Sequence, residues 1–326
     1  MTAIELRGVR KEFADVTAVR DLDLTVDDGE VYGFLGPNGA GKSTTIDMLL
    51  DLVRPTAGTV RVLGADVATD GVEIRRKTGV LPDGFSVYDR LSGRRHVEFA
   101  VESKEVDDDP DALLDRVGLA GDGDRPAGEY SKGMRQRLAL AMALVGDPDL
   151  LILDEPSSGL DPAGAKEMRE IVRTEADRGA TVFFSSHLLE QVDAVCDRVG
   201  ILRDGELVAE DSVEGLREAV GGEETLEVAA AGADDEAVAA VRAVAGVSGV
   251  TRDGDELVVN CASDAKTDVI AALEDAGVAV ADFHTREASL EDLFLAYTEG
   301  DAAERDTDAS DSTRPDDETA AEEVDS

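Results

Sequence analysis

Cysteine and long apolar runs are both scarce in this sequence. Cys196 and Cys261 lie in different halves of the 326-residue chain and form no metal-ligand spacing, which favours two reduced packing thiols. The longest apolar runs, such as LALAMALV at 138–145, are far shorter than the roughly 20 residues that span a bilayer. The N-terminal residues MTAIELRGVRKEF carry charges throughout and contain no signal-peptide core. We therefore expect a cytosolic protein without a membrane span of its own.

Positive charge is scarce as well. The chain has 73 acidic and 32 basic residues, of which only seven are lysine, and its net charge is -41 at pH 7. This charge repels nucleic acid and argues against a DNA or RNA partner. The acids are spread over nearly every segment, which favours a general role in solvation. Such a surface suits a cytosol with molar salt, where the Debye length is roughly 3 Å, so we hypothesise a halophilic protein.

The first two thirds of the chain predict one α/β unit. Over residues 1–217, short apolar strands such as VYGFL, LLILD, TVFFSS and RVGIL alternate with helical segments. The strand LLILD is apolar on both faces, as expected of a buried parallel strand. Residues 84–145 are mostly helical in pattern and more charged, and we interpret them as a helical insert.

A second, smaller domain is predicted after a break at GGEE, residues 221–224. Residues 222–298 have the pattern of a compact α+β sandwich, and residues 299–326 are almost all Asp, Glu, Ala, Ser and Thr, which predicts a disordered acidic tail. The elements expected in the sandwich are a strand at 225–231, a helix at 234–245, a hairpin around 252–256, a helix at 265–276, a strand at 278–284 and a helix at 289–297.

The stretch FLGPNGAGKST, residues 34–44, fits the phosphate-binding pattern G-x-x-x-x-G-K-[ST]. Glycines let successive backbone N–H groups approach an anion, and a helix beginning near Lys42 adds the positive end of its dipole. Lys42 can reach the β- and γ-phosphates and Ser43 can hold Mg²⁺. The predicted nucleotide-binding residues of this loop are Gly36, Pro37, Asn38, Gly39, Ala40, Gly41, Lys42, Ser43 and Thr44.

Two carboxylates end the apolar strand in LLILDEP. A metal-bound γ-phosphate needs one carboxylate near the Mg²⁺ and another that orients or deprotonates the attacking water. Asp154 suits the first role and Glu155 the second. An isolated acidic pair would simply mark the junction between a strand and a turn. Because this pair follows the lysine of the phosphate-binding loop by 112 residues, we favour the catalytic roles instead.

Three further stretches could complete a nucleotide site. YSKGM places Ser131 and Gly133 at the start of a helix, where an ordinary N-cap is the alternative explanation. SSGLDP places Asp161 in a tight turn, and FFSSH places His187 at the end of a strand that could lie beside LLILD. A lone histidine at a strand end is usually structural, but here its ring could reach a γ-phosphate.

In this order and spacing the segments resemble the ATP-binding cassette, the nucleotide-binding subunit of ABC transporters. GPNGAGKST is similar to Walker A, LLILDEP to Walker B, and SGLD, with Asp161, to the D-loop; His187 is similar to the switch histidine. YSKGM, with Ser131, Lys132, Gly133 and Met134, resembles the family signature. The resemblance covers residues 1–217 and implies an ABC cassette that hydrolyses ATP with Mg²⁺, with Lys42, Glu155 and His187 as catalytic residues.

Two departures from the family pattern qualify the resemblance, and one further match has an alternative explanation. The signature usually ends in Gly-Gly-Gln, whereas this chain has Lys132, Gly133 and Met134. Asp83 stands where the family carries the glutamine of its Q-loop, and an acid there could hold Mg²⁺ or water or alter coupling to a membrane partner. Phe13 matches the aromatic residue that stacks on adenine, although from the residues alone a core phenylalanine is the alternative explanation.

The resemblance also implies partners. ABC cassettes pack head to tail, so that the signature of one chain completes the ATP site of the other, and the single cassette here implies a homodimer or a heterodimer with a close relative. Transport requires an integral-membrane permease, which would place this chain on the cytoplasmic face of the cell membrane. Residues 84–100 would receive the permease's coupling helix, with a solvated helix as the alternative.

The ending SLEDLFLAYT, 289–298, indicates the direction of transport. A short domain with this ending resembles the C-terminal extension of exporter-type cassettes that serve drug, antibiotic, sodium or lipid-linked export, although the extension could equally dimerise, regulate or simply be a folded appendage. The alternatives are an importer ATPase and a soluble ABC ATPase without a permease. A kinase or GTPase would leave YSKGM, SGLD and His187 unexplained, and a guanine-reading N-K-x-D is absent from the sequence.

Overall fold

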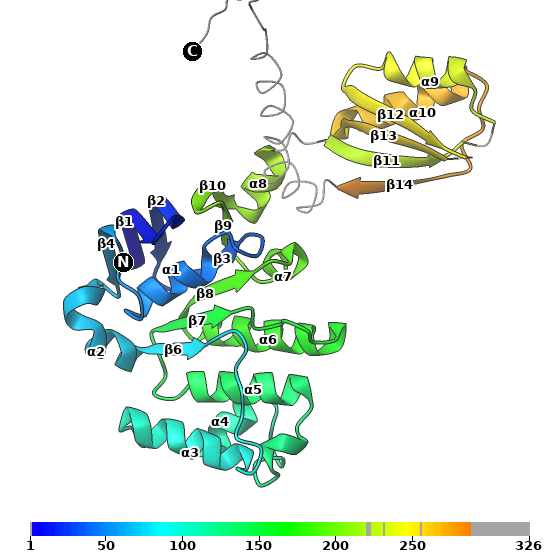
Figure 1. Ribbon diagram of the computed structural model, residues 1–326. Coiled ribbons are helices and arrows are strands. Elements are labelled where there is room, and N and C mark those ends of the chain that lie inside the picture. The colour runs from blue at the N-terminus through cyan, green and yellow to red at the C-terminus, as the bar shows by residue number, and fades with distance from the viewer. Residues whose placement is uncertain (1, 220–222, 231, 255, 288–326) are drawn as a thin grey trace, which may run out of the picture.

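The computed structural model describes residues 2–219, 223–230, 232–254 and 256–287 (Figure 1). In this described part of the chain, no helix combines the length and the apolar character needed to cross a bilayer.

A six-stranded sheet in the order β10-β9-β3-β8-β7-β6 forms the centre of the N-terminal unit. Its strands pair in parallel except for the antiparallel pair β9 and β10. All residues of β3, β7 and β8 are buried, because both faces of this sheet are covered. The four predicted strands are present as β3, β7, β8 and β9. The strands are β3 (Val31–Leu35), β6 (Thr78–Leu81), β7 (Leu150–Asp154), β8 (Thr181–Ser186), β9 (Arg198–Arg203) and β10 (Glu206–Ser212).

A second, antiparallel sheet in the order β2-β1-β4-β5 was not anticipated from the sequence. Its long strands alternate between buried apolar and exposed charged residues, so that only one face is apolar. That face supplies Ile4 and Leu6 to the same core as Tyr32 and Phe34 of β3. The strands are β1 (Thr2–Phe13), β2 (Val16–Asp27), β4 (Ala57–Val62) and β5 (Ala65–Asp66).

Helices cover the central sheet and extend beyond its β6 edge, where α3, α4 and α5 lie together (Figure 1). In the segment 84–145, which the sequence suggested as a helical insert, the first helix begins at Gly93, where Ser92 accepts a hydrogen bond from the N–H of Arg95. The helices of this unit are α1 (Lys42–Leu49), α2 (Val67–Lys77), α3 (Gly93–Lys104), α4 (Pro110–Arg116), η1 (Ala127–Glu129), α5 (Lys132–Ala143), α6 (Pro162–Asp177), α7 (Leu189–Asp193) and α8 (Val213–Ala219).

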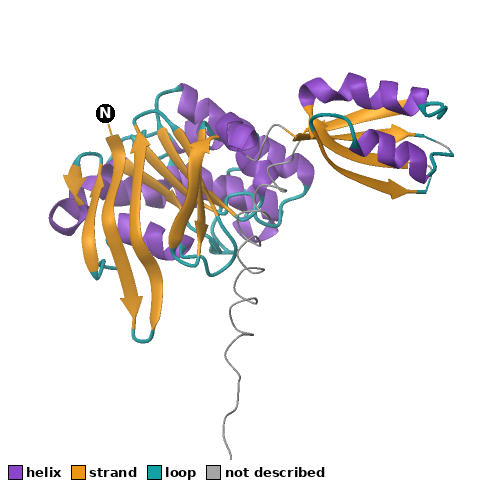
Figure 2. Cartoon of the chain, turned by 90° about the horizontal axis from the view of Figure 1, so that it is seen from above, coloured by secondary structure: helices purple, strands orange, loops and turns teal. Residues whose placement is uncertain are grey.

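The C-terminal residues form a four-stranded antiparallel sheet in the order β12-β13-β11-β14, with two helices on one face (Figure 2). The prediction of an α+β fold is therefore confirmed. The expected strand at 278–284 begins only at Asp282, which pairs with Ala229 at the end of β11. The predicted helix 289–297 and the tail 299–326 lie outside the described residues. The elements are β11 (Glu223–Ala229), α9 (Asp235–Arg242), β12 (Val247–Asp253), β13 (Glu256–Ala262), η2 (Ser263–Ala265), α10 (Lys266–Asp275) and β14 (Asp282–Glu287).

Candidate nucleotide site

The carboxyl ends of three adjacent strands carry the candidate site. In the sheet, β8 lies between β3 and β7 and is parallel to both. The phosphate-binding loop follows β3, Asp154 ends β7 and Glu155 comes next, and His187 directly follows β8. Since neighbouring parallel strands end at the same edge, segments more than 100 residues apart in sequence meet at one point.

Two glycines of the loop are required by close backbone packing. Gly41, which precedes the first residue of α1, has a φ of 110°, and a Cβ there would stand 2.5 Å from the carbonyl oxygen of Ala18. A Cβ on Gly36 would stand 2.5 Å from the carbonyl oxygen of Leu202. With glycine at both positions, the loop folds tightly enough for α1 to begin at Lys42, so that its free N–H groups lie at the cleft.

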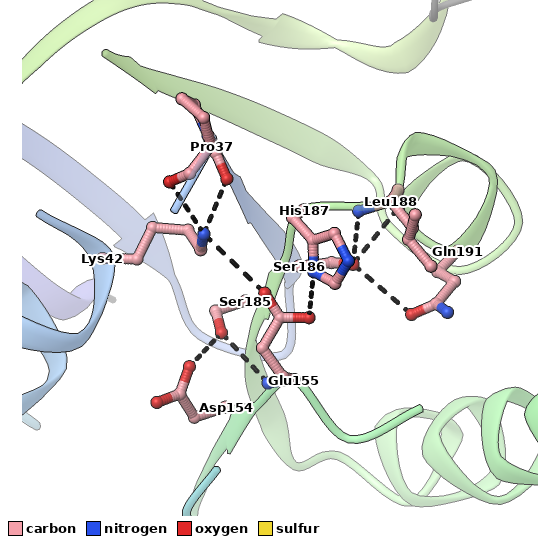
Figure 3. Close-up of polar contacts among 10 residues, drawn as sticks. Pro37, Lys42, Asp154, Glu155, Ser185, Ser186, His187, Leu188 and Gln191 are labelled. Carbon is pink, nitrogen blue, oxygen red and sulfur yellow. Dashed lines mark hydrogen bonds and ion pairs between the residues drawn. The ribbon is translucent and has the colours of Figure 1, made fainter. Parts of the chain in front are cut away.

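Lys42 is a buried cation whose ammonium is held by the loop itself (Figure 3). Its Nζ donates to the carbonyl oxygens of Gly36 at 2.6 Å and Pro37 at 3.3 Å, and lies 3.7 Å from Oε1 of Glu155. Burial lowers the pKa of Lys42, while the nearby carboxylates oppose this shift. The lysine therefore lies between the phosphate-binding loop and the two acids.

Asp154 is a buried carboxylate, and the hydroxyl of Ser185 donates a hydrogen bond to its Oδ1 (Figure 3). Burial raises the pKa of Asp154, and the Ser185 hydrogen bond opposes that rise. Sequence reasoning missed Ser185, although it lies directly beside Asp154 in the register of β7 and β8.

Glu155 adopts a left-handed backbone conformation, with a φ of 50°, which a non-glycine residue holds only at a cost of about 1–3 kcal/mol. Its N–H donates to the backbone oxygen and to Oγ of Ser185, both at 3.2 Å. The carboxylate lies between two nitrogens: Oε2 is 2.8 Å from Nδ1 of His187, and Oε1 faces Lys42. The structure thus brings together three of the residues predicted from separate motifs.

Lys42, Asp154 and Glu155 border a cleft of about 180 Å³, whose described lining does not include His187. Asp83, the residue in the Q-loop position, belongs to its lining, and so does Ala18, which the sequence did not suggest. Gly36 and Ala40 are not among the described lining residues: the carbonyl oxygen of Gly36 accepts a hydrogen bond from Lys42, and Ala40 is buried. The cleft is lined by Ala18, Pro37, Asn38, Gly39, Gly41, Lys42, Ser43, Thr44, Asp83, Asp154 and Glu155.

The signature and D-loop residues lie elsewhere in the same chain. Ser131 caps α5 by accepting a hydrogen bond from the N–H of Met134 at 3.2 Å, and Asp161 caps α6 through the N–H of Gly164 at 3.0 Å. Lys132 extends to Gly159, where a Cβ would meet its Nζ at 1.9 Å. In the described residues, neither Ser131 nor Gly133 belongs to the lining of the cleft.

Phe13 is not among the described residues that line the cleft. It ends β1 at the hairpin to β2, its side chain is 45% exposed, and Nζ of Lys11 lies 4.6 Å from its ring centroid. This exposure shows that Phe13 does not belong to the core, which was the alternative that the sequence left open. Among the described residues that line the cleft, β2 contributes Ala18 rather than an aromatic side chain.

A relative that covers nearly the whole chain shows the family. The daunorubicin resistance ATP-binding protein DrrA3 of Streptomyces coeruleorubidus is 35% identical over 309 residues, which are 92% of this chain and 97% of the relative. This chain belongs to the ABC transporter ATP-binding proteins. The ABC transporter family model matches residues 19–158, and the model of the ATP-binding protein DrrA1-3-like C-terminal domain matches residues 212–298.

Other comparisons agree with this membership. The bacitracin transport ATP-binding protein BcrA of Bacillus licheniformis is 39% identical and covers 64% of this chain and 69% of its own length. A solved ATP-binding subunit of an ABC transporter is 27% identical, has a TM-score of 0.61, and covers 68% of this chain and 94% of its own. The predicted fold class and the prediction of an exporter-type ABC ATPase are confirmed at the level of family.

The site's oxygens suit the Mg²⁺ that accompanies ATP. Magnesium prefers oxygen ligands, usually one or two carboxylates together with phosphate oxygens. The carboxylate of Asp154 is buried, which raises its pKa, and a cation would supply its counter-charge. The hydroxyl of Ser43 and the carboxylate of Asp83 line the same cleft. This donor set fits magnesium.

Proposed function

We propose that this chain hydrolyses ATP at sites shared between two cassettes and drives a separate membrane permease that exports an antibiotic-like compound. The observation that carries the proposal is the convergence of Lys42, Glu155 and His187 at the end of the phosphate-binding loop. Export of antibiotic-type cargo is supported by the daunorubicin resistance and bacitracin transport proteins among the relatives.

Each of these side chains has a role in hydrolysis. The N–H groups at the start of α1 and the ammonium of Lys42 bind the phosphates, and Glu155 accepts a proton from the attacking water. His187, hydrogen-bonded to Glu155, orients that carboxylate and contacts the γ-phosphate. Ser43, Asp154 and Asp83 would hold Mg²⁺, which would neutralise negative charge on the phosphates.

A second cassette completes the site. The signature residues lie at the start of α5, which Ser131 caps and which continues through Lys132, Gly133 and Met134. Neither these residues nor Asp161 of the D-loop belong to the described lining of the cleft in their own chain. A head-to-tail dimer brings this helix N-terminus to the γ-phosphate of the opposite chain. The dimer is a homodimer or a pair with a close relative, and the exposed ring of Phe13 stacks on the adenine of its own chain.

The permease docks beside the helical insert. A groove of about 320 Å³ lies there, and the exposed side chains of Tyr88 and Phe99 border it together with Leu91 and Met142. Exposed aromatic residues around an apolar groove are typical of a binding site for an amphipathic helix. This contact would hold the chain on the cytoplasmic face of the membrane, with residues 1–217 as the cassette and 222–298 as an accessory domain.

Removing the two aromatic anchors should separate the ATPase from its permease. We expect the double variant Tyr88→Ala, Phe99→Ala to lower permease recovery at least about tenfold, because central aromatic residues dominate interface energies. Leu52→Ala is the matched control, since Leu52 is 67% exposed but follows the C-cap of α1 and is not among the residues that line the groove. The measurement is the amount of permease recovered with each tagged chain; equal recovery with the double variant would reject the groove as the docking site.

Purification from membranes tests the function itself. Tagged Glu155→Gln chain, held in the ATP-bound form, would be isolated with ATP and molar KCl from detergent-solubilised host membranes. Recovery of a multi-span membrane protein in about equal amount supports the transporter. A clean soluble dimer without a membrane protein would favour an ATPase that acts without a permease.

We further infer that the protein works in molar salt. With a net charge of -41, mutual repulsion of the acids destabilises the fold until ions screen it. The midpoint of thermal unfolding should therefore rise when KCl is added. Choline chloride at the same ionic strength should raise it as well. A midpoint that stays constant, with full activity in dilute buffer, would contradict this inference.

A further inference from the structure

We propose that Ser186 and Gln191 are positioning residues that hold the backbone on either side of His187 for ATP hydrolysis. The proposal rests on the function proposed above for His187, and it concerns two residues to which no motif assigns a role. Both lie next to the exposed histidine but are themselves buried: Ser186 is 0% and Gln191 7% exposed. Figure 3 shows the two side chains facing one another behind the histidine.

Ser186 fixes the start of the histidine segment. It is the last residue of β8, and its carbonyl oxygen accepts a hydrogen bond from the N–H of Gly36 at 3.3 Å, which joins this strand end to the phosphate-binding loop. Its hydroxyl accepts a hydrogen bond from the N–H of Leu188 at 2.9 Å. Ser186 therefore bonds to the residue on the far side of His187 and closes a tight turn around it.

Gln191 fixes the end of the segment. It lies in α7, its N–H donates to the carbonyl oxygen of Leu188 at 3.3 Å, and its Oε1 lies 3.4 Å from Oγ of Ser186. The Ser186 hydroxyl has one proton, which it gives either to Oε1 of Gln191 or to the carbonyl oxygen of Leu188 at 3.2 Å. A buried polar pair of this kind would be costly if either partner were removed.

The histidine itself lacks such support. Its side chain is 40% exposed, and among the described residues its ring makes a polar contact with Glu155, whose own position depends on Ser185. An exposed side chain keeps several rotamers open, so the position of the ring depends on a fixed backbone. Small displacements of a reacting group lower the rate strongly, while the affinity for ATP is set mainly by the separate phosphate-binding loop.

The test compares Gln191→Leu with Glu190→Leu in purified full-length chain. Glu190 is the exposed neighbour of Gln191 on the same helix, so its variant controls for changes in α7. We expect Gln191→Leu to lower kcat about tenfold with an unchanged KM for ATP, Ser186→Ala to do the same, and Ser186→Thr, which keeps the hydroxyl, to retain activity. An unchanged kcat in both Gln191→Leu and Ser186→Ala would overturn the proposal.

Two further measurements separate this proposal from the function on which it rests. In a His187→Ala background, Gln191→Leu should have no additional effect on kcat, since Gln191 is proposed to act only by positioning His187. Hydrogen exchange of residues 186–191 should be faster in Gln191→Leu than in Glu190→Leu, whether or not the histidine is catalytic. If His187→Ala keeps full turnover while exchange is still faster in Gln191→Leu, the catalytic role of His187 is wrong but Gln191 does hold this segment. If exchange of residues 186–191 is the same in both variants, Gln191 does not hold the segment and the proposal is rejected.

Discussion

Replacing Glu155 by glutamine should give a protein that binds ATP but hydrolyses it at least about 100-fold more slowly, the usual loss when a general base is removed. Glutamine keeps the size of the side chain and can still contact His187 and Lys42, whose atoms lie 2.8 and 3.7 Å from the carboxylate. It cannot accept the proton of the attacking water. Phosphate release from ATP in molar KCl measures the rate, and size-exclusion chromatography should show an ATP-dependent dimer.

A buried glutamate outside the cleft provides the control. Glu175 in α6 is 3% exposed and forms ion pairs with Arg116 at 2.5 Å and Arg178 at 2.6 Å. None of these three residues belongs to the described lining of the cleft. Glu175→Gln should lower the melting temperature, because two arginines lose a charged partner, and leave kcat unchanged. If Glu155→Gln hydrolysed ATP at the native rate, the role assigned to Glu155 would be wrong.

The sequence predicted the catalytic edge of the sheet because its signals are local. VYGFL, LLILD and TVFFSS are short, mostly apolar strands that are buried along their whole length, and functional residues lie at or directly after their carboxyl ends. Once the three strands are parallel and adjacent, the distances among Lys42, Glu155 and His187 follow from the topology. The helix start at Lys42 was predictable for the same reason, since glycine at position 41 permits a φ of 110°.

What the sequence did not reveal depends on contacts between segments. The strands β1, β2 and β4 alternate buried and exposed residues, but many exposed positions are charged, as they are in most segments of this chain, so the strand pattern did not stand out in the sequence. Ser185 and Ser186 look alike in sequence, yet the first contacts Asp154 and the second turns toward α7. Gln191 acquires its partner only when α7 folds back onto the end of β8. The position of Phe13 at a hairpin tip likewise depended on strand register.

Replacing Lys42 by alanine should weaken ATP binding itself. The ammonium is buried at the mouth of the phosphate-binding loop, and hydrogen bonds to a charged group contribute about 1.5–3 kcal/mol each. Loss of one such contact corresponds to a dissociation constant at least about tenfold higher. Titration calorimetry with ATP and Mg²⁺ in molar KCl measures this change directly, without requiring hydrolysis.

Lys104 offers a matched comparison, because it too is a partly buried lysine bound to two backbone carbonyl oxygens, those of Thr78 at 3.1 Å and Val145 at 2.8 Å. Burial lowers the pKa of both lysines. Lys104→Ala should therefore destabilise the fold at the junction of β6 and α5 but leave the affinity for ATP unchanged. The two variants together separate the effect of losing a buried ammonium from the effect of losing a phosphate contact. An undiminished affinity for ATP in Lys42→Ala would refute the assignment of Lys42 to the phosphates.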